Sequence, residues 1–159
     1  MSLTTNQPAV ADEGEYSVRR TIRIAAPLEK VWSAVTDPVH VSTWFGRTEL
    51  DGTDAGATGT MTFDDGGAIP LRIEAVDPMR LVSYRWNNDD ALARPPKKFD
   101  DATSTVFSFT LEPTSDGTQL TVVETGFDRT SNPAANLASH VDGWTAELDK
   151  LVALLETAS

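Results

Sequence analysis

Three side chains capable of acid–base chemistry stand out in the sequence, namely Tyr84, Glu124 and His140. Trp144 lies four residues after His140, and Glu147 lies three residues after Trp144. A helix would therefore place all three side chains on one face. A histidine in that position could hydrogen-bond a ligand carbonyl or act as an acid or a base. It could equally be a packing residue whose ring is satisfied by backbone groups. The sequence leaves both interpretations of His140 open.

Glu124 falls on the same side of an alternating segment as Leu120 and Val122. If the strand is regular, the carboxylate is buried and needs a partner or a raised pKa. The Tyr84 hydroxyl or a ligand could then donate a hydrogen bond to it. If the strand twists outward at its end, Glu124 is solvated instead. These residues are therefore candidate catalytic groups, but no reaction can be assigned to them, and binding is favoured over catalysis.

Other kinds of chemistry have no support in the sequence. It contains no dinucleotide or phosphate-binding glycine motif, no H-E-x-x-H and no G-x-S-x-G elbow. His40 and His140 are far apart, which argues against a histidine metal site, and the Asp pairs lack the spacing of a calcium loop. We expect neither a metal nor a cofactor.

Composition indicates an ordinary globular domain with an acidic surface. The chain has 159 residues, 40% of them hydrophobic, and a formal net charge of -11. That charge repels nucleic acid and anionic membrane surfaces, so neither is an expected partner. The absence of cysteine fits a reducing compartment. No apolar run approaches the roughly 20 residues of a membrane span, and no secretory signal is visible, so we expect a cytoplasmic protein.

The elements that must position these side chains are mostly strands. Residues 1–15 look like a flexible tail. Two short helices, at residues 27–36 and 38–45, follow the first strand, and Gly46 is expected to end the second in a left-handed conformation. Asp64–Gly67 has the composition of a hairpin turn, and short connections of this kind imply an antiparallel meander. Strands are predicted by alternation at residues 16–25, 47–50, 58–63, 68–76, 81–86, 103–111 and 118–125.

One long amphipathic helix closes the chain. Its apolar stripe comprises Leu137, Val141, Trp144, Leu148, Leu151 and Leu155, at alternating gaps of four and three. Gly143 interrupts this helix at a cost of about 1 kcal/mol relative to Ala. Close approach of a neighbouring strand or side chain is the first explanation for Gly143, and clearance for a ligand is the second. A sheet curved around this helix can leave a cavity between them.

Residues 87–102 break the strand pattern because they are rich in Asp, Asn and Pro. A connection of this length is either a lid or disordered. Trp32 is assigned to core packing, whereas the other large apolar side chains near the expected cavity are candidates for its lining. The expected ligand-binding residues are Trp44, Phe45, Met61, Phe63, Tyr84, Trp86, Phe107, Phe109, His140 and Trp144.

Three segments carry a resemblance to a known family: APLEKVWSAVTDP at 26–38, VSTWFG at 41–46 and HVDGWTAELDKL at 140–151. In this order they resemble the heat-shock-protein ATPase activator-like branch of the START-like superfamily, also called SRPBCC or helix-grip, and its bacterial members in particular. The resemblance covers about residues 16 to 157, which would form a single domain.

The resemblance implies an α+β helix-grip fold, in which a curved antiparallel sheet of about six or seven strands wraps around the C-terminal helix. The implied function is binding of a small hydrophobic or amphipathic ligand between sheet and helix. Because apolar side chains on the outer face of the predicted sheet are few, we expect a monomer or weak homodimer. Two alternatives remain: a polyketide cyclase/dehydratase-like enzyme using the same cavity, and a co-chaperone-like interaction module with a chaperone partner. The sequence shows no counterpart of the separate chaperone-binding domain of the eukaryotic co-chaperone, which weakens the last alternative.

Overall fold

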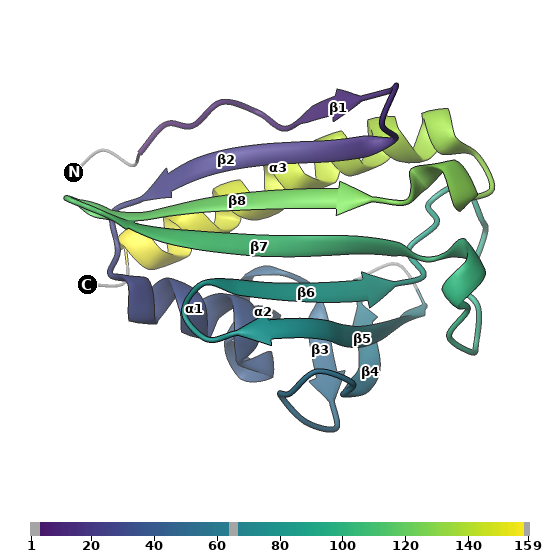
Figure 1. Cartoon of the computed structure of the whole chain (residues 1–159), viewed down its shortest axis with the longest axis horizontal. Helices are drawn as coiled ribbons and strands as arrows, with labels where there is room; N and C mark the ends of the chain where they lie inside the picture. Colours follow the sequence, from purple (N-terminus) through teal and green to yellow (C-terminus); the bar gives the residue numbers. More distant parts are fainter. Residues whose placement is uncertain (1–3, 64–66, 158–159) are drawn as a thin grey trace.

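A computed structural model describes residues 4–63 and 67–157, which form an antiparallel sheet and three α-helices (Figure 1). The helices are α1 (Leu28–Thr36), α2 (Pro38–Trp44) and α3 (Pro133–Thr157), with short 3-10 turns η1 (Asp101–Thr103) and η2 (Phe127–Arg129). The strands are β1 (Val10–Asp12), β2 (Ser17–Ile24), β3 (Arg47–Leu50), β4 (Thr58–Thr62), β5 (Ala68–Asp77), β6 (Leu81–Trp86), β7 (Thr105–Thr114) and β8 (Gly117–Thr125).

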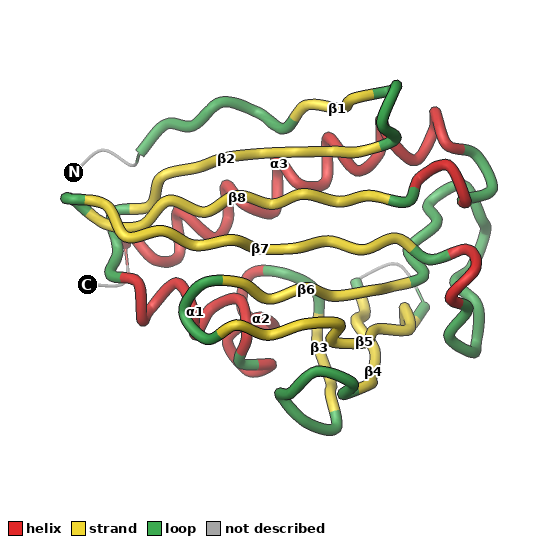
Figure 2. Tube along the Cα trace, viewed as in Figure 1, coloured by secondary structure: helices red, strands yellow, loops and turns green. Residues whose placement is uncertain are grey.

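All eight strands belong to one sheet in the order β1-β2-β8-β7-β6-β5-β4-β3, with every neighbouring pair antiparallel. The long helix α3 runs along one face of this sheet, and α1 and α2 pack near one of its ends (Figures 1 and 2). This arrangement is the predicted α+β helix-grip fold, which is thereby confirmed. The sheet has eight strands instead of six or seven because β1 lies in the segment expected to be a tail.

The prediction of a flexible tail over residues 1–15 is wrong for its described part. Val10–Asp12 pairs with Ser17–Arg19 of β2, and the backbone N–H of buried Ala9 donates to Thr145 Oγ1 at 3.0 Å. Without β1, β2 would be the edge strand and would present unpaired backbone groups, which a segment can satisfy without an apolar pattern of its own. The alternation rules therefore could not detect β1.

Alternation does place the side chains of the central strands correctly. The inward positions of β7 and β8 are buried, and α3 buries the predicted Leu137, Trp144, Leu148 and Leu151 against them. Val141 and Leu155 lie at the edge of the stripe and are half-buried. The core is therefore made by one face of the sheet and one face of α3, as the helix-grip prediction requires.

Of the two turns predicted around glycines, the structure describes in full only the one at Gly46. The left-handed cap at Gly46 is wrong, because α2 ends at Trp44 and Phe45 is its C-cap, with φ -98°. Gly46 is instead required by close packing, since a Cβ there would lie 2.6 Å from Met61 Cγ. The predicted hairpin turn at 64–67 falls largely outside the described residues.

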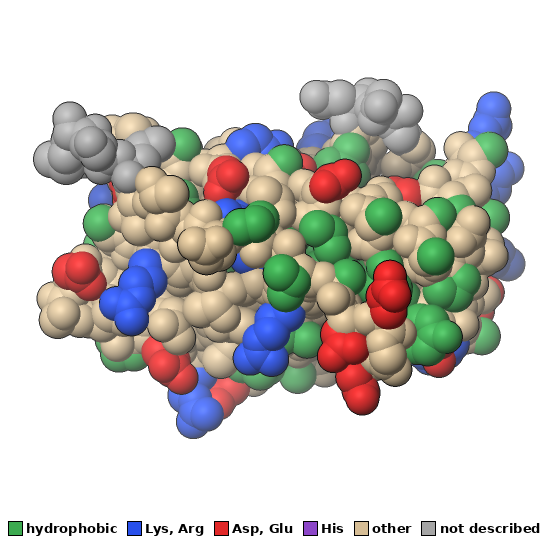
Figure 3. Space-filling view, turned by 90° about the horizontal axis from the view of Figure 1, so that it is seen from above, with side chains coloured by type: hydrophobic (Ala, Val, Ile, Leu, Met, Phe, Trp, Pro, Cys, Tyr) green, Lys and Arg blue, Asp and Glu red, His purple; other side chains and the backbone are tan. Residues whose placement is uncertain are grey.

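Exposed apolar side chains are dispersed over the described surface. The large ones are Val10, Tyr16, Val39, Met79 and Leu92, which come from different elements. On the face that Figure 3 shows, hydrophobic side chains lie among acidic and basic ones. Within residues 4–63 and 67–157, no helix is both long enough and apolar enough to cross a membrane.

Candidate functional site

The carboxylate of Glu124, on β8, is the centre of a buried polar network. Its Oε1 accepts hydrogen bonds from His140 Nδ1 at 2.7 Å and Trp144 Nε1 at 2.8 Å. Its Oε2 accepts from Trp86 Nε1 at 2.8 Å and Thr105 Oγ1 at 2.6 Å. Glu124 is fully buried, because β8 remains regular to its end, so the solvated alternative is wrong. With four donors, both oxygens of this carboxylate are satisfied.

His140 and Glu124 form a buried ion pair. Burial lowers the pKa of His140, but the adjacent Glu124 and Asp90 carboxylates outweigh burial and raise it to about 10. Burial raises the pKa of Glu124, but the charge and hydrogen bonds of His140 outweigh this effect and hold the pKa below its usual value. The other ring nitrogen of His140, Nε2, lies 3.0 Å from the Asn88 carbonyl oxygen, to which it donates. One ring nitrogen of His140 is thus satisfied by a backbone carbonyl, as expected for a packing residue, whereas the other is paired with the Glu124 carboxylate.

Tyr84 does not belong to this network. Its hydroxyl donates to the Val35 carbonyl at 2.6 Å, and burial raises its pKa. The predicted hydrogen bond from Tyr84 to Glu124 is therefore wrong. Of the three candidate catalytic residues, the structure brings together only Glu124 and His140.

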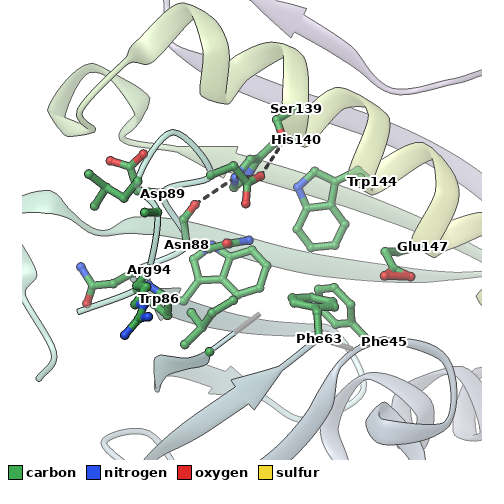
Figure 4. A pocket seen from close by; sticks show the side chains of 18 residues that line it. Phe45, Phe63, Trp86, Asn88, Asp89, Arg94, Ser139, His140, Trp144 and Glu147 are labelled. Carbon is green, nitrogen blue, oxygen red and sulfur yellow. Dashed lines mark hydrogen bonds and ion pairs between the residues drawn. The ribbon is translucent and has the colours of Figure 1, made fainter. Parts of the chain in front are cut away.

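A pocket of about 360 Å³ opens beside this network, between α3, the loop after β6, Phe45 and the β4–β5 region (Figure 4). This volume is at the lower end of the range of about 300–1,000 Å³ that is usual for small-molecule sites. Its lining comprises Phe45, Phe63, Gly67, Ile69, Trp86, Asn87, Asn88, Asp89, Asp90, Leu92, Ala93, Arg94, Pro95, Ser139, His140, Gly143, Trp144 and Glu147.

The structure brings five of the ten expected ligand-binding residues to this pocket: Phe45, Phe63, Trp86, His140 and Trp144. It does not bring the other five, which are Trp44, Met61, Tyr84, Phe107 and Phe109. Each of these is at most 4% exposed and belongs to the packed core, as Trp86 and Trp144 also do, but none of the five borders the pocket. These five side chains do not reach the pocket because it lies near the loop after β6. The remaining space under α3 is filled by packed aromatic rings.

Four aromatic rings form the apolar wall of the pocket. The Phe45 ring centroid lies 5.5 Å from Phe63, 5.8 Å from Trp86 and 5.4 Å from Trp144. The two indoles cannot rotate freely, because both donate their N–H to Glu124. The carboxylate thus positions two of the four rings.

Gly143 lines the pocket from α3. A Cβ at this position would meet no atom within 4 Å, other than those of the helix itself and its chain neighbours. The close-approach explanation for this glycine is therefore wrong. A side chain at this position would therefore meet open space on the pocket side of α3.

Residues 87–102 follow a defined path, and the first part of this loop, residues 87–90 and 92–95, lines the pocket. At the base of this loop, the Asn87 side chain donates to the Asp100 carbonyl at 2.8 Å and accepts from the Asp100 N–H at 2.9 Å. Buried Asn136 of α3 accepts from the Asp90 N–H and donates to Asp89, both at 2.8 Å. Between these anchors, residues 92–95 line the pocket.

Sequence reasoning missed Asn136, Asp89 and Asp90 as site residues. One signal for Asn136 was available, since it lies one helical turn before His140 and so shares its face. Burial raises the pKa of Asp89, but hydrogen bonds from Ser131 and Asn136 outweigh burial and lower it. Asp89 is therefore an ionised anchor of the loop. Within the described part of the chain, no group of three or more His, Asp or Glu side chains is arranged to hold a metal ion.

The sheet, the gripping helix and the pocket beside it define a START-like domain of the SRPBCC superfamily. The chain belongs to the family described as Activator of Hsp90 ATPase homolog 1-like protein, which matches residues 25–156. No curated protein matches the chain.

Several solved structures are similar to this one. MLL2253 from Mesorhizobium loti is 30% identical with a TM-score of 0.73, and the match covers 90% of this chain and 98% of that chain. DynU16, a protein of the dynemicin biosynthetic locus, is 27% identical with a TM-score of 0.70, covering 90% of this chain and 48% of that one. The Aha1 dimer of Colwellia psychrerythraea shares the fold at 20% identity and a TM-score of 0.69, covering 88% and 96%.

Proposed function

We propose that this protein binds a small, largely hydrophobic ligand in the pocket between α3 and the loop after β6. The observation that carries the proposal is the aromatic wall of Phe45, Phe63, Trp86 and Trp144 beside a polar rim. Mostly apolar lining with a few placed polar groups is usual for small-molecule sites. Membership of a ligand-binding superfamily supports the same function.

Gly143 adds an energetic argument. A glycine inside a helix costs about 1 kcal/mol relative to Ala, and nothing in the packing around Gly143 requires it. A side chain at this position would occupy the pocket. Retention of a destabilising residue is explained if the space must remain open for a ligand.

The enzyme alternative is disfavoured because the hydrogen-bonding groups of its two candidate catalytic residues, Glu124 and His140, are already occupied. Glu124 already accepts four hydrogen bonds, and both ring nitrogens of His140 are engaged. A histidine with a pKa of about 10 is protonated at neutral pH and cannot act as a general base there. Because the chain is similar to DynU16, a product or intermediate of a biosynthetic pathway is one kind of ligand that fits the proposal.

The interaction-module alternative lacks a matching surface. The large exposed apolar side chains of the described residues are dispersed and do not form one patch. We therefore propose that a cytoplasmic monomer or weak homodimer carries the ligand, the dimer being suggested by the Aha1 structure from Colwellia psychrerythraea.

The test is to fill the pocket at Gly143. Wild type is expected to bind the neutral fluorescent probe N-phenylnaphthylamine at one saturable site, and Gly143→Leu is expected to lose this binding. Because a side chain at this position meets no neighbour and leucine favours helix, the variant should keep or gain stability. Thermal unfolding would verify this.

Ala146→Leu supplies the matched control, since Ala146 is an exposed residue of α3 outside the pocket. It adds a comparable side chain without entering the site, so probe binding should be unchanged. Equal probe affinity in Gly143→Leu and wild type would refute the pocket as the binding site. Native mass spectrometry of freshly purified protein would show whether a bound molecule is retained.

A further inference from the structure

Glu147 is a charged pocket residue whose ion-pair partner is an exposed side chain. It lies one turn after Gly143 on α3, and its side chain is 15% exposed. Its Oε2 is buried, and the charged group beside it is the Lys150 ammonium. The contact it makes is an ion pair at 2.5 Å with Lys150, a side chain that is itself 56% exposed. Figure 4 shows the Glu147 carboxylate in the same part of the pocket as Trp144, Phe45 and Phe63.

The aromatic wall is suited to a positive charge. The face of an aromatic ring attracts cations, and indole does so most strongly. Trp86 and Trp144 both donate their N–H groups to the Glu124 carboxylate. Hydrogen bonds in a low-dielectric interior polarise their partners, so donation to an anion increases the electron density of both rings. The pocket thus combines electron-rich rings with a carboxylate.

The cationic groups around the pocket are already engaged or are solvated. His140 is paired with Glu124 at 2.7 Å and lies 3.3 Å from Asp90, and Lys150 is paired with Glu147. Arg94 lies on the exposed part of the loop, where water and salt screen its charge. The buried cation that lines the pocket, His140, is therefore already paired with carboxylates and is not free to receive an anionic ligand.

We propose that the ligand is an organic cation, an amine with an aromatic or polycyclic body, whose ammonium group pairs with Glu147 while its body lies against Phe45, Phe63, Trp86 and Trp144. This inference builds on the proposed function and adds the charge of the ligand to it. On binding, the ammonium group replaces Lys150 as the partner of Glu147. The lysine side chain is 56% exposed, so its ammonium group can move into solvent when the ligand binds.

The experiment compares three probes of one shape and different charge: naphthylmethylamine, naphthylmethanol and naphthoate. Their affinities are measured by calorimetry or by ligand-observed NMR at neutral pH and low ionic strength. Wild type is expected to bind the amine about tenfold more tightly than the alcohol, and the carboxylate most weakly.

Variants on α3 assign this preference to one carboxylate. Glu147→Gln should remove the preference for the amine while leaving the affinity for the alcohol within about twofold of wild type. Asp142→Asn is the matched control, because it removes the same formal charge from an exposed position outside the pocket and should preserve the preference. Lys150→Gln removes the competing cation and should strengthen binding of the amine.

The outcomes separate this inference from the proposed function. Binding of all three probes with equal affinity, or a preference for the amine that survives in Glu147→Gln, would overturn the inference and leave the binding function standing. Failure of all three probes to bind would overturn both.

Discussion

Replacing Glu124 by Gln should be among the most damaging conservative substitutions in this protein. Glutamine keeps the shape of the side chain but turns one oxygen into an NH₂ group. That group would face either the Trp86 and Thr105 donors or the Trp144 and His140 donors. Removing one member of a buried ion pair costs about 3–5 kcal/mol, since the other charge loses its partner. This is a large fraction of the roughly 5–15 kcal/mol that stabilises a typical domain.

The same substitution should change how stability depends on pH. The pKa of His140 is raised from 6.5 to about 10 in the folded protein, so the stability it contributes is complete below pH 6.5 and is lost as pH rises towards 10. In this interval the native state holds one more proton than the unfolded chain, which gives a loss of about 1.4 kcal/mol per pH unit. The lowered pKa of Glu124 acts oppositely, and its contribution is lost as pH falls below 4.5.

Urea unfolding, followed by tryptophan fluorescence at several pH values, measures both effects. Wild type should lose stability between pH 6.5 and 10, whereas Glu124→Gln and His140→Gln should each show a flatter profile. In a double-mutant cycle, the combined variant should lose less than the sum of the single variants, by about 1–3 kcal/mol. A Glu124→Gln protein within about 1 kcal/mol of wild type, with an unchanged pH profile, would refute the buried ion pair.

Two further substitutions, and a third that serves as a comparison, test contacts that support the site. Asn87→Ala removes both side-chain hydrogen bonds to Asp100, so amide hydrogen exchange should accelerate across the loop while the protein stays folded. Arg20 is 3% exposed and donates to the Gln7 and Thr145 carbonyls and to Asp149. Its replacement by Ala should therefore cost about 2–4 kcal/mol in chemical denaturation, whereas Asp149→Ala, which removes an exposed partner, should cost less than about 1 kcal/mol.

The sequence predicted the fold well because the fold depends on periodic apolar patterns. The spacing of apolar residues predicts strands whose inward side chains include Phe107, Phe109 and Val122. The same rule predicts a helix with Leu148 and Leu151 on one face. The edge strand β1 lacked such a pattern, since it contributes backbone hydrogen bonds and little buried apolar surface.

The site was predicted less well, for a different physical reason. Residue type showed that large aromatics would face the helix, but it could not show which space they fill and which they leave open. Tyr84 and Phe107 stack on each other at 5.2 Å in the core, whereas Trp86, two residues from Tyr84, reaches the pocket. The outcome depends on the path of the loop after β6, which is set by Asn136 and other polar contacts without sequence periodicity.

The buried Glu124 therefore serves the pocket more than it serves stability. Replacing a buried ion pair by apolar groups of similar volume is often neutral or stabilising, so an ion pair is not the most stable way to fill this space. An apolar residue at position 124, however, could not hold the Trp86 and Trp144 indoles by their N–H groups or fix the His140 ring. Without the carboxylate, both buried indoles would lose their shared acceptor and the histidine would lose its partner. The carboxylate therefore ties two rings of the aromatic wall and the His140 ring to β8.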